Sequence, residues 1–224
     1  MTSDWDKVID SLSTITVTSH PNNDPVSIHG SAPQVTCIGI GTDAAVFQSA
    51  LAPSFAFKKY AKENIAKVDV EASVYQTLGQ SFYFSTCFAA YEDTLVLSFE
   101  EGKTLLDCVL QGIHIPKQVI KDVEDAREFI HTKGLHPRDI HLKNIILQKG
   151  RAKLLDVSAY IRPCNDFRWE HLKQGYDQCY HVIDGKPVPF WLVRTIQRWY
   201  NQKSARRYPQ EDFIKTVISY FHKS

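Results

Sequence analysis

The stretch GLHPRDIHLKNIIL, residues 134–147, places acidic, basic, imidazole and amide side chains together in one short segment. Asp139 and Asn144 lie five residues apart, and Asp156 follows Asn144 by twelve. Between Asn144 and Asp156 the apolar pattern predicts a hairpin that turns at residues 149–150. Amide and carboxylate oxygens at the two ends of a short hairpin can converge on one Mg²⁺, which prefers such ligands. Asp139, just upstream, would then be placed to accept a proton from an attacking hydroxyl.

A lysine and a glutamate form a second candidate pair. In SFAFKKY, residues 54–60, phenylalanine alternates with alanine and lysine, which predicts a half-buried strand with Lys58 on the side of Ala56. Glu71 lies on the apolar face of a helix predicted over 62–78, where a carboxylate is expected only if it is paired. We therefore expect Lys58 and Glu71 to pair. The pattern also allows Lys58 to extend its charge to water and Glu71 to lie at the edge of the apolar stripe.

Two glycines, Gly39 and Gly41, lie in a turn between two predicted strands in IGIGTDAAVF. Glycines at such a turn let backbone N–H groups approach phosphate oxygens without a Cβ in the way. Taken alone, the same pattern fits an ordinary hairpin turn, which is the simpler interpretation. No helix begins after the turn and no Gly-Lys-Ser/Thr follows, which excludes a dinucleotide-binding fingerprint and a Walker loop.

The remaining pattern predicts strands in the first half of the chain and helices in the second. A turn-rich stretch over residues 19–33 follows an N-terminal helix and strand, and a further strand is expected over 93–99. Helical periodicity is found over 116–134 and again over 208–221. This order indicates an α+β fold. A cleft between two such halves is a usual place for a ligand.

Composition narrows the classes of protein to consider. The 224 residues include 26 Lys+Arg and 25 Asp+Glu, so a formal charge of +1 gives no reason to expect binding to nucleic acid or to an anionic membrane. The basic run RWYNQKSARR, residues 198–207, is most simply a helix with an aromatic core face and a solvated basic face. Five scattered cysteines without a CxxC pair, an acidic start and no long apolar run together predict a cytoplasmic protein.

Five motifs, taken in order, resemble those of the protein-kinase-like superfamily. They are IGIGTDAAVF, FAFK, VEASVYQTLG, HPRDIHLKN and LLDVSAY, and together they cover about residues 35–160. The resemblance implies a bilobal protein-kinase-like fold. It would have a β-rich N-lobe with one main helix over about 35–97, a hinge at 98–102, and a reduced, mainly helical C-lobe over 103–224. Residues 1–34 would form an N-terminal extension that packs on or flanks the N-lobe.

The resemblance also implies roles for single residues. Gly39 and Gly41 would cover the phosphates of ATP, and Lys58 would hold the α- and β-phosphates in an orientation fixed by Glu71. The catalytic aspartate would be Asp139, and Mg²⁺ would be held by Asn144 and Asp156. Lys143 could hold the γ-phosphate. The adenine would be bounded by Ala56 and Ile146, and its edge would be read by the hinge residues Ser98, Phe99 and Glu100.

Several positions depart from the family pattern. His136 is separated from Arg138 by Pro137, where the family has a contiguous His-Arg-Asp. His141 replaces the lysine of serine/threonine kinases, and small-molecule kinases of the aminoglycoside and choline type often have histidine there. Asp156 is followed by Val-Ser instead of Phe-Gly, and only 68 residues remain after it. The large lobe is therefore expected to be pared down.

We expect an ATP- and Mg²⁺-dependent phosphotransferase, because every residue needed for phosphoryl transfer is present. The favoured function is a serine/threonine protein kinase that transfers the γ-phosphoryl group to a hydroxyl. Two alternatives remain open at this point. The first is a small-molecule kinase of the aminoglycoside or choline type, and the second is a nucleotide-binding pseudokinase that acts as a scaffold. The phosphoacceptor, protein or small molecule, is not identified by the sequence.

Overall fold

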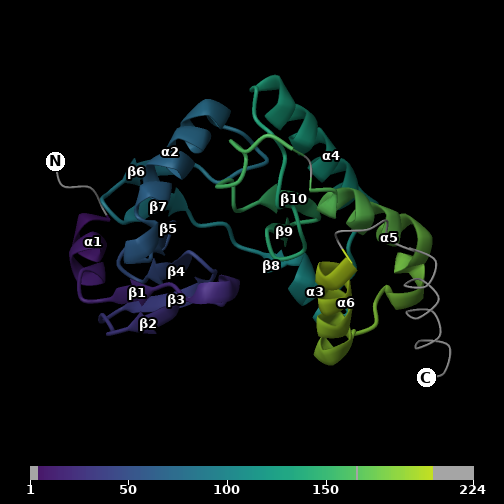
Figure 1. Ribbon diagram of the computed structural model, residues 1–224, viewed down its shortest axis with the longest axis horizontal. Helices are drawn as coiled ribbons and strands as arrows, with labels where there is room; N and C mark the ends of the chain where they lie inside the picture. Colours follow the sequence, from purple (N-terminus) through teal and green to yellow (C-terminus); the bar gives the residue numbers. More distant parts are fainter. Residues whose placement is uncertain (1–4, 165, 204–224) are drawn as a thin grey trace. The chain divides into compact units, whose positions relative to one another are not determined.

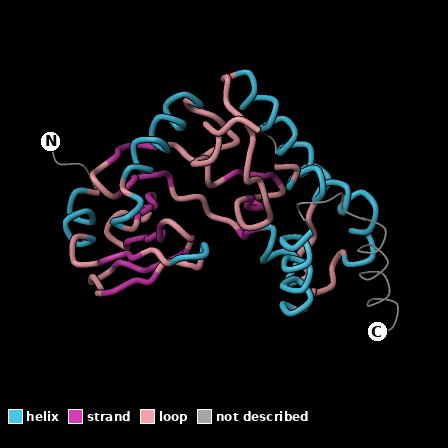
Figure 2. Tube along the Cα trace, viewed as in Figure 1, coloured by secondary structure: helices cyan, strands magenta, loops and turns pink. Residues whose placement is uncertain are grey.

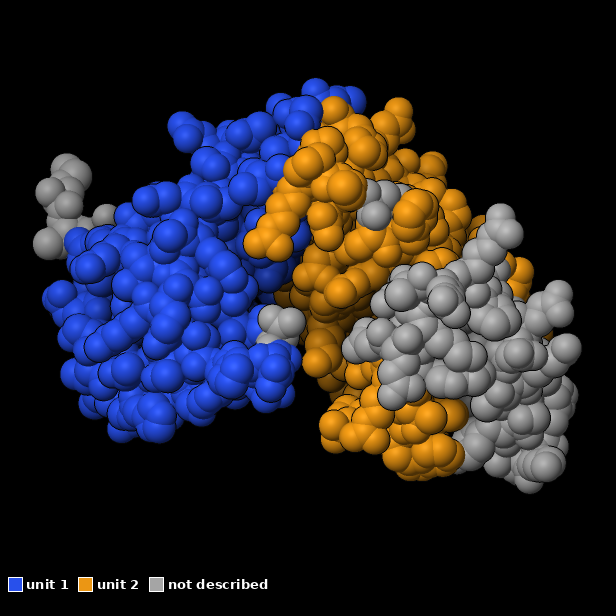
Figure 3. Space-filling model, in the orientation of Figure 1, with its two compact units in different colours: residues 1–101, 132–135, 156–161 blue, residues 102–131, 136–155, 162–224 orange. Residues whose placement is uncertain are grey.

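The computed structural model describes residues 5–164 and 166–203, and the chain divides into two compact units, coloured in Figure 3. Unit 1 contains residues 1–101, 132–135 and 156–161, and unit 2 contains the remainder. Strands predominate in unit 1 and helices in unit 2 (Figure 2). The predicted α+β class is confirmed, and the elements are compatible with a protein-kinase-like fold. Within the described residues, none of the helices is both long and apolar enough to cross a membrane.

The main sheet of unit 1 has five antiparallel strands in the order β3-β4-β5-β7-β6 (Figure 1). In chain order the strands are β3 (Val35–Ile40), β4 (Ala44–Ser49), β5 (Phe55–Tyr60), β6 (Cys87–Ala90) and β7 (Thr94–Ser98). A short 3₁₀ turn (Lys62–Asn64) precedes α2 (Ala66–Leu78), which ends at Gly79 with a positive φ of 66°. The helix predicted over 62–78 is thus confirmed except for its first turn.

Residues 5–34 supply a second layer on this sheet. They form α1 (Asp6–Leu12), β1 (Thr16–Thr18), a 3₁₀ turn (Pro21–Asn23) and β2 (Ser27–His29), which pairs with β1. Buried side chains from this segment, including Val8 and Leu12, share one core cluster with Phe57 of β5. The next residue of the strand, Lys58, faces α2 instead, since successive side chains of a strand point to opposite faces.

The sequence-based expectation of a half-buried strand at β5 is therefore wrong. Five of its six residues are buried, because β5 lies in the centre of the sheet and both of its faces are covered. The alternation of residue types separates two buried faces here, one apolar against the α1 layer and one polar against α2. The residue types of such a strand alternate as they do in a half-buried strand, although neither of its faces is exposed.

Up to residue 203, the described part of unit 2 holds a small sheet and four helices. Its sheet has the order β10-β9-β8, with β8 (Lys103–Thr104), β9 (Ile145–Gln148) and β10 (Arg151–Leu154). The helices are α3 (Leu105–Gln111), α4 (Lys117–Thr132), α5 (Arg168–Ile183) and α6 (Phe190–Lys203). The predicted hairpin turn is confirmed, since Lys149 and Gly150 both have positive φ, 50° and 78°. Helix α4 confirms the helix predicted over 116–134, whereas the one predicted over 208–221 lies outside the described residues.

A buried aspartate of α4 fixes the β9–β10 hairpin. The Asp122 carboxylate, 0% exposed, accepts hydrogen bonds from Nε and Nη2 of Arg151, each at 2.8 Å. It also accepts the backbone N–H of Ala152 at 2.9 Å and the side-chain amide of Gln118 at 2.8 Å. With its oxygens satisfied from two elements, Asp122 holds the hairpin against the helix.

A second polar cluster fixes α5 against α4. The Glu124 carboxylate accepts the indole N–H of Trp169 at 2.6 Å and the ammonium of Lys173 at 2.5 Å. Arg127, one turn further along α4, donates to Glu170 at 2.5 Å. These contacts place the first turn of α5, which begins at Arg168.

Replacing Asp122 tests its role in fixing the hairpin. Although burial opposes ionisation, the bonds from Arg151, Gln118 and Ala152 hold the pKa of Asp122 below its usual 3.8. The unfolded carboxyl keeps the higher pKa, so this stabilisation is present above about pH 4 and is lost as the pH falls through the lower folded-state pKa. We expect Asp122→Asn to lower the free energy of unfolding by about 2 kcal/mol at pH 7 and by less at pH 3.

Urea unfolding at the two pH values measures the difference. The control is Glu128→Gln, which changes an exposed carboxylate on the same helix and should leave stability unchanged. Equal stability of Asp122→Asn and the wild type at pH 7 would contradict the assignment.

Candidate functional site

Three residues of unit 1 that were predicted to act together meet at one ammonium group. Lys58 Nζ lies 2.9 Å from Oε1 and 2.7 Å from Oε2 of Glu71, and 3.3 Å from Oδ2 of Asp156. The side chain of Lys58 is 11% exposed and that of Glu71 is 0% exposed. Lys58 therefore does not extend to water, and Glu71 lies under the sheet rather than at the edge of its stripe. The geometry brings β5, α2 and the segment after β10 to one point.

The charges at this point reinforce one another. Burial alone would lower the pKa of Lys58, but the carboxylates of Asp156 and Glu71 outweigh it and hold that pKa well above its usual value. Burial likewise opposes ionisation of Asp156, yet Lys58 and Ser158 bring its pKa to about 2. Burial raises the pKa of Glu71, and Lys58 limits the rise. At neutral pH the ammonium and the Asp156 carboxylate are thus both charged.

Tyr60 joins this cluster and was not singled out from the sequence. Its hydroxyl donates to Oε2 of Glu71, and its ring centroid lies 5.4 Å from the Lys58 ammonium. The signal available in the sequence was the spacing, since residues two apart on a strand share a face. A buried tyrosine needs a partner for its hydroxyl, and on this face Glu71 provides one.

Asp156 is oriented by Ser158, which stands where the family pattern has glycine. The backbone N–H of Ser158 donates to Asp156 Oδ1 at 3.0 Å, and the Ser158 side chain also lowers the pKa of Asp156. Val157 between them is fully buried. The Val-Ser pair thus anchors the segment through an apolar side chain and orients the carboxylate through hydrogen bonds.

The glycine turn is a tight two-residue hairpin between β3 and β4. The N–H of Gly41 donates to the carbonyl of Ala44 at 2.9 Å, and a Cβ on Gly41 would come within 3.2 Å of that oxygen. At the tip, Asp43 pairs with Lys67 of α2 at 2.7 Å. The pairing of β3 with β4 shifts register between Cys37 and Gly39. Neither glycine has a positive φ. Close backbone approach therefore favours glycine at position 41, whereas a Cβ at position 39 would meet only the Val46 side chain, at 3.6 Å.

The predicted adenine-binding residues lie in both units. In unit 1, Ala56 is 7% exposed, and in unit 2, Ile146 is 3% exposed. Of the predicted hinge, the N–H of Ser98 donates to Thr86 and that of Phe99 to Ser54, at 2.8 and 2.9 Å. These two residues could therefore offer only carbonyl groups to the edge of a base. The side chain of the third hinge residue, Glu100, accepts the Ser98 hydroxyl at 2.6 Å.

In unit 2, Asp139 lies in a constrained turn with a φ of 55°, unusual for a residue with a side chain. Its N–H donates to Oδ2 of Asp166 at 2.8 Å, and its carbonyl accepts Nδ2 of Asn144 at 3.1 Å. Asn144 in turn accepts the N–H of Leu155 on its carbonyl at 2.9 Å, which closes the β9–β10 hairpin. The predicted catalytic aspartate and metal-binding asparagine are thus directly connected.

An arginine and a histidine lie close to the Asp139 carboxylate. Nη1 of Arg168 donates to Oδ1, and Nε2 of His141 lies 3.5 Å from the same oxygen. The backbone N–H of Lys143 donates to Nδ1 of His141 at 3.2 Å, and the Lys143 side chain is exposed. Asp166 and Arg168 were not predicted from the sequence, because they lie 27 and 29 residues after Asp139 and no local pattern connects them to it.

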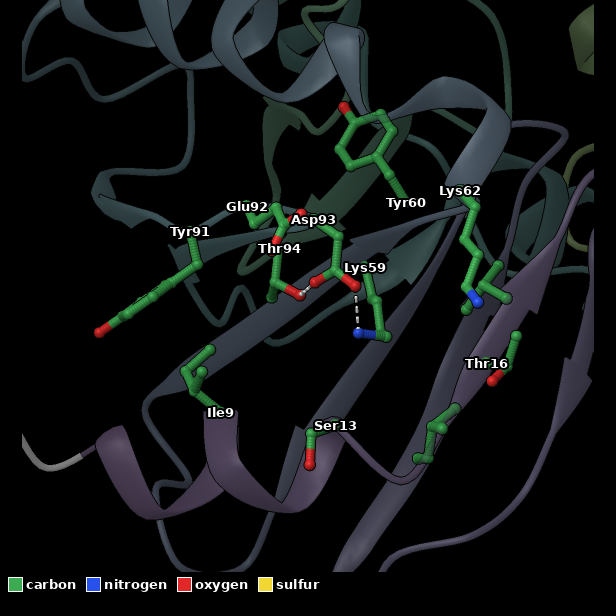
Figure 4. A pocket seen from close by; sticks show the side chains of 12 residues that line it. Ile9, Ser13, Thr16, Lys59, Tyr60, Lys62, Tyr91, Glu92, Asp93 and Thr94 are labelled. Carbon is green, nitrogen blue, oxygen red and sulfur yellow. Dashed lines mark hydrogen bonds and ion pairs between the residues drawn. The ribbon is translucent and has the colours of Figure 1, made fainter.

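The hollow drawn in Figure 4 shares one residue, Tyr60, with the cluster around Lys58. It has a volume of about 430 Å³, and α1, β1 and the end of β5 contribute to its lining. Lys59 projects into it and pairs with Asp93 at 2.5 Å. None of the predicted site residues lines this hollow. Of the two neighbouring lysines of β5, Lys58 alone therefore serves the predicted site.

Comparison with known proteins points in the same direction as the geometry. No family model matches the chain. The chain is 29% identical over 182 residues to a protein of Bacillus subtilis (strain 168) named "Putative serine/threonine-protein kinase YrzF". The match covers 78% of this chain and 85% of that protein. This similarity supports a kinase-like phosphotransferase. It does not define the phosphoacceptor.

The anchoring of Asp139 by Asp166 can be tested without any ligand. Asp166→Ala removes a charge-assisted hydrogen bond to the Asp139 amide, so the turn should open more readily. We expect amide hydrogen exchange over residues 136–144 to become about tenfold faster. Hydrogen exchange read by mass spectrometry checks this, with Asp177→Ala, an exposed change on α5, as the control. Unchanged exchange in Asp166→Ala would show that the contact does not hold the turn.

Proposed function

We propose that the chain is an ATP-dependent serine/threonine protein kinase that transfers the γ-phosphoryl group of Mg-ATP to a protein hydroxyl. The observation that carries the proposal is the Lys58 ammonium, held between Glu71 and Asp156 at 2.7 and 3.3 Å. A cation fixed by two carboxylates in this way is already positioned for phosphate oxygens. In phosphoryl transfer the protein contributes mainly position and charge, which is what this cluster provides.

In this proposal Lys58 binds the α- and β-phosphates while Glu71 holds its orientation. The raised pKa of Lys58, which the two carboxylates maintain against burial, keeps it charged over the whole neutral range. Gly39 and Gly41 bring the backbone of the β3–β4 turn close to the phosphates. That turn is also tied to α2 by the pair of Asp43 and Lys67.

The donor set also fits Mg²⁺. Asp156 is ionised at neutral pH because its pKa is about 2, and the amide nitrogen of Asn144 is occupied by the Asp139 carbonyl, which directs its oxygen elsewhere. Among the described residues, no three or more His, Cys, Asp or Glu side chains gather to hold a metal ion. A Mg²⁺ held by Asn144 and Asp156 would complete its shell with phosphate and water oxygens, and it would neutralise phosphate charge during transfer.

Asp139 acts on the acceptor in this proposal. The acceptor oxygen forms a bond to the γ-phosphorus as the bond from that phosphorus to the ADP oxygen breaks, and the hydroxyl proton passes to the Asp139 carboxylate. The anchors from Asp166 and Asn144 hold the constrained turn, so the carboxylate is presented in a fixed orientation. Lys143, whose side chain is exposed, would contact the γ-phosphate in this proposal.

A protein acceptor is favoured because the similar Bacillus protein is named as a serine/threonine kinase. One observation favours a small-molecule acceptor instead. Nε2 of His141 lies 3.5 Å from Asp139 Oδ1. Histidine at this position resembles the pattern of small-molecule kinases. Both functions use the same phosphoryl-transfer residues and differ only in the acceptor, so one assay can distinguish them.

The assay incubates the pure protein with γ-labelled ATP and Mg²⁺, alone, with generic protein substrates and with hydroxylated metabolites. Label on protein supports the proposal, whereas label on a metabolite supports the second function. Lys58→Met and Asp139→Asn should each reduce transfer at least about tenfold, because they remove the phosphate cation and the proton acceptor. Lys62→Met, which changes an exposed lysine just after β5, should retain activity.

Two results would contradict the proposal. Full activity in Lys58→Met or Asp139→Asn would exclude the assigned roles. Thermal stabilisation by ATP without transfer, equal in the wild type and in Asp139→Asn, would identify a nucleotide-binding pseudokinase.

A further inference from the structure

The Glu71 carboxylate has two donors on the same strand. Lys58 reaches both of its oxygens, and the Tyr60 hydroxyl donates to Oε2, which lies 2.7 Å from the Lys58 ammonium. All three groups are buried, with Tyr60 2% and Glu71 0% exposed. Glu71 is therefore bound to β5 through two side chains of one strand face.

Phosphate binding would disturb only one of these two bonds. In the proposed function, Lys58 turns its ammonium toward the phosphates, and it is already shared with Asp156 at 3.3 Å. A buried carboxylate that loses its cation is costly unless other donors satisfy it. Glu71 therefore needs a donor that stays in place when Lys58 is shared further.

We propose that Tyr60 is the positioning residue that keeps Glu71, and with it helix α2, attached to β5 while Lys58 serves the phosphates. The part that concerns phosphates rests on the proposed function, whereas the attachment of α2 does not. A consequence is that α2 is held in the paired position in the nucleotide-free protein, without any covalent modification.

The environment of Tyr60 suits a permanent donor. Burial raises the pKa of Tyr60 far above its usual 10.0, with Glu71 adding to the rise against the opposing charge of Lys58. The phenol thus stays protonated and can donate at any ordinary pH. Other titratable groups facing Glu71 include Asp156, Tyr75 and Cys87. Burial raises the pKa of Tyr75 well above its usual value and that of Cys87 to about 11.

A second polar tie between α2 and the sheet is more exposed and weaker. Lys67 pairs with Asp43 of the β3–β4 turn at 2.7 Å, but the two side chains are 35% and 40% exposed. Ion pairs at this exposure contribute little, because water and salt screen them. The buried bond from Tyr60 to Glu71 is therefore expected to matter more for the position of α2.

The first experiment measures amide hydrogen exchange of the nucleotide-free protein. Tyr60→Phe keeps the ring and its packing and removes only the hydroxyl. Exchange over α2, residues 66–78, should become about tenfold faster. The control is Tyr91→Phe, which removes a hydroxyl that bonds Trp5 and Asp6 in the same unit, and it should leave α2 unchanged. Exchange over α2 in Tyr60→Phe equal to that of the wild type would overturn the proposal.

The second experiment asks whether Tyr60 acts through Glu71. Calorimetric titration with Mg-ATP should show about fivefold weaker binding for Tyr60→Phe than for the wild type. In a Glu71→Gln background the same change should have little further effect, because the two residues act as one unit. Equal losses in the two backgrounds would assign Tyr60 a role independent of Glu71.

A kinetic measurement separates positioning from general damage. In the transfer assay, Tyr60→Phe should raise the KM for ATP about fivefold and change kcat by less than about twofold. A fall in kcat alone would count against the positioning role. Absence of ATP binding by the wild type would overturn the proposed function, while the exchange experiment would still decide whether Tyr60 holds α2.

Discussion

The ammonium of Lys58 is the interaction on which unit 1 depends. Burying Lys58 and Glu71 beside the partly exposed Asp156 is tolerable only because each charge meets an opposite one within 3.3 Å. That requirement fixes α2 against β5 and brings the chain back to unit 1 after β10. The same three charges therefore stabilise the fold of this unit and form its proposed phosphate-binding group. A change that loosens the charges would loosen the elements as well.

Each of two predicted site residues, Asp156 and Asp139, is oriented by a hydrogen bond with a neighbouring polar residue. Asp156 is oriented by Ser158, and the Asp139 turn is oriented by Asp166. In each case a residue of expected chemical importance is held by a neighbour that departs from, or lies outside, the family motifs. In unit 2 this anchoring continues outward, since Glu124 of α4 fixes the helix that follows Asp166.

Much of the local structure could be predicted because it leaves a periodic signal. Helices α2 and α4 have apolar residues at steps of three and four, and Gly79 and Gly134, both with positive φ, follow their ends. The pairing of Lys58 with Glu71 followed from the cost of leaving either charge unpaired. The burial of β5 could not be read from its own residues, because the α1 layer that covers it comes from a distant part of the chain. The contacts of Asp166 and Arg168 with Asp139 were missed for the same reason, since sequence separation hides them.

The hairpin between Asn144 and Asp156 carries a consequence for how related chains can diverge. Its strands pair from Ile145 opposite Leu154 to the turn, and the bond from Leu155 to the Asn144 carbonyl seals the open end. One extra residue in each strand would move the turn outward and leave this seal intact. A single extra residue in one strand would force a bulge and turn part of that strand over. Length changes within the two strands should therefore come in matched pairs, whereas the turn itself can take a single extra residue.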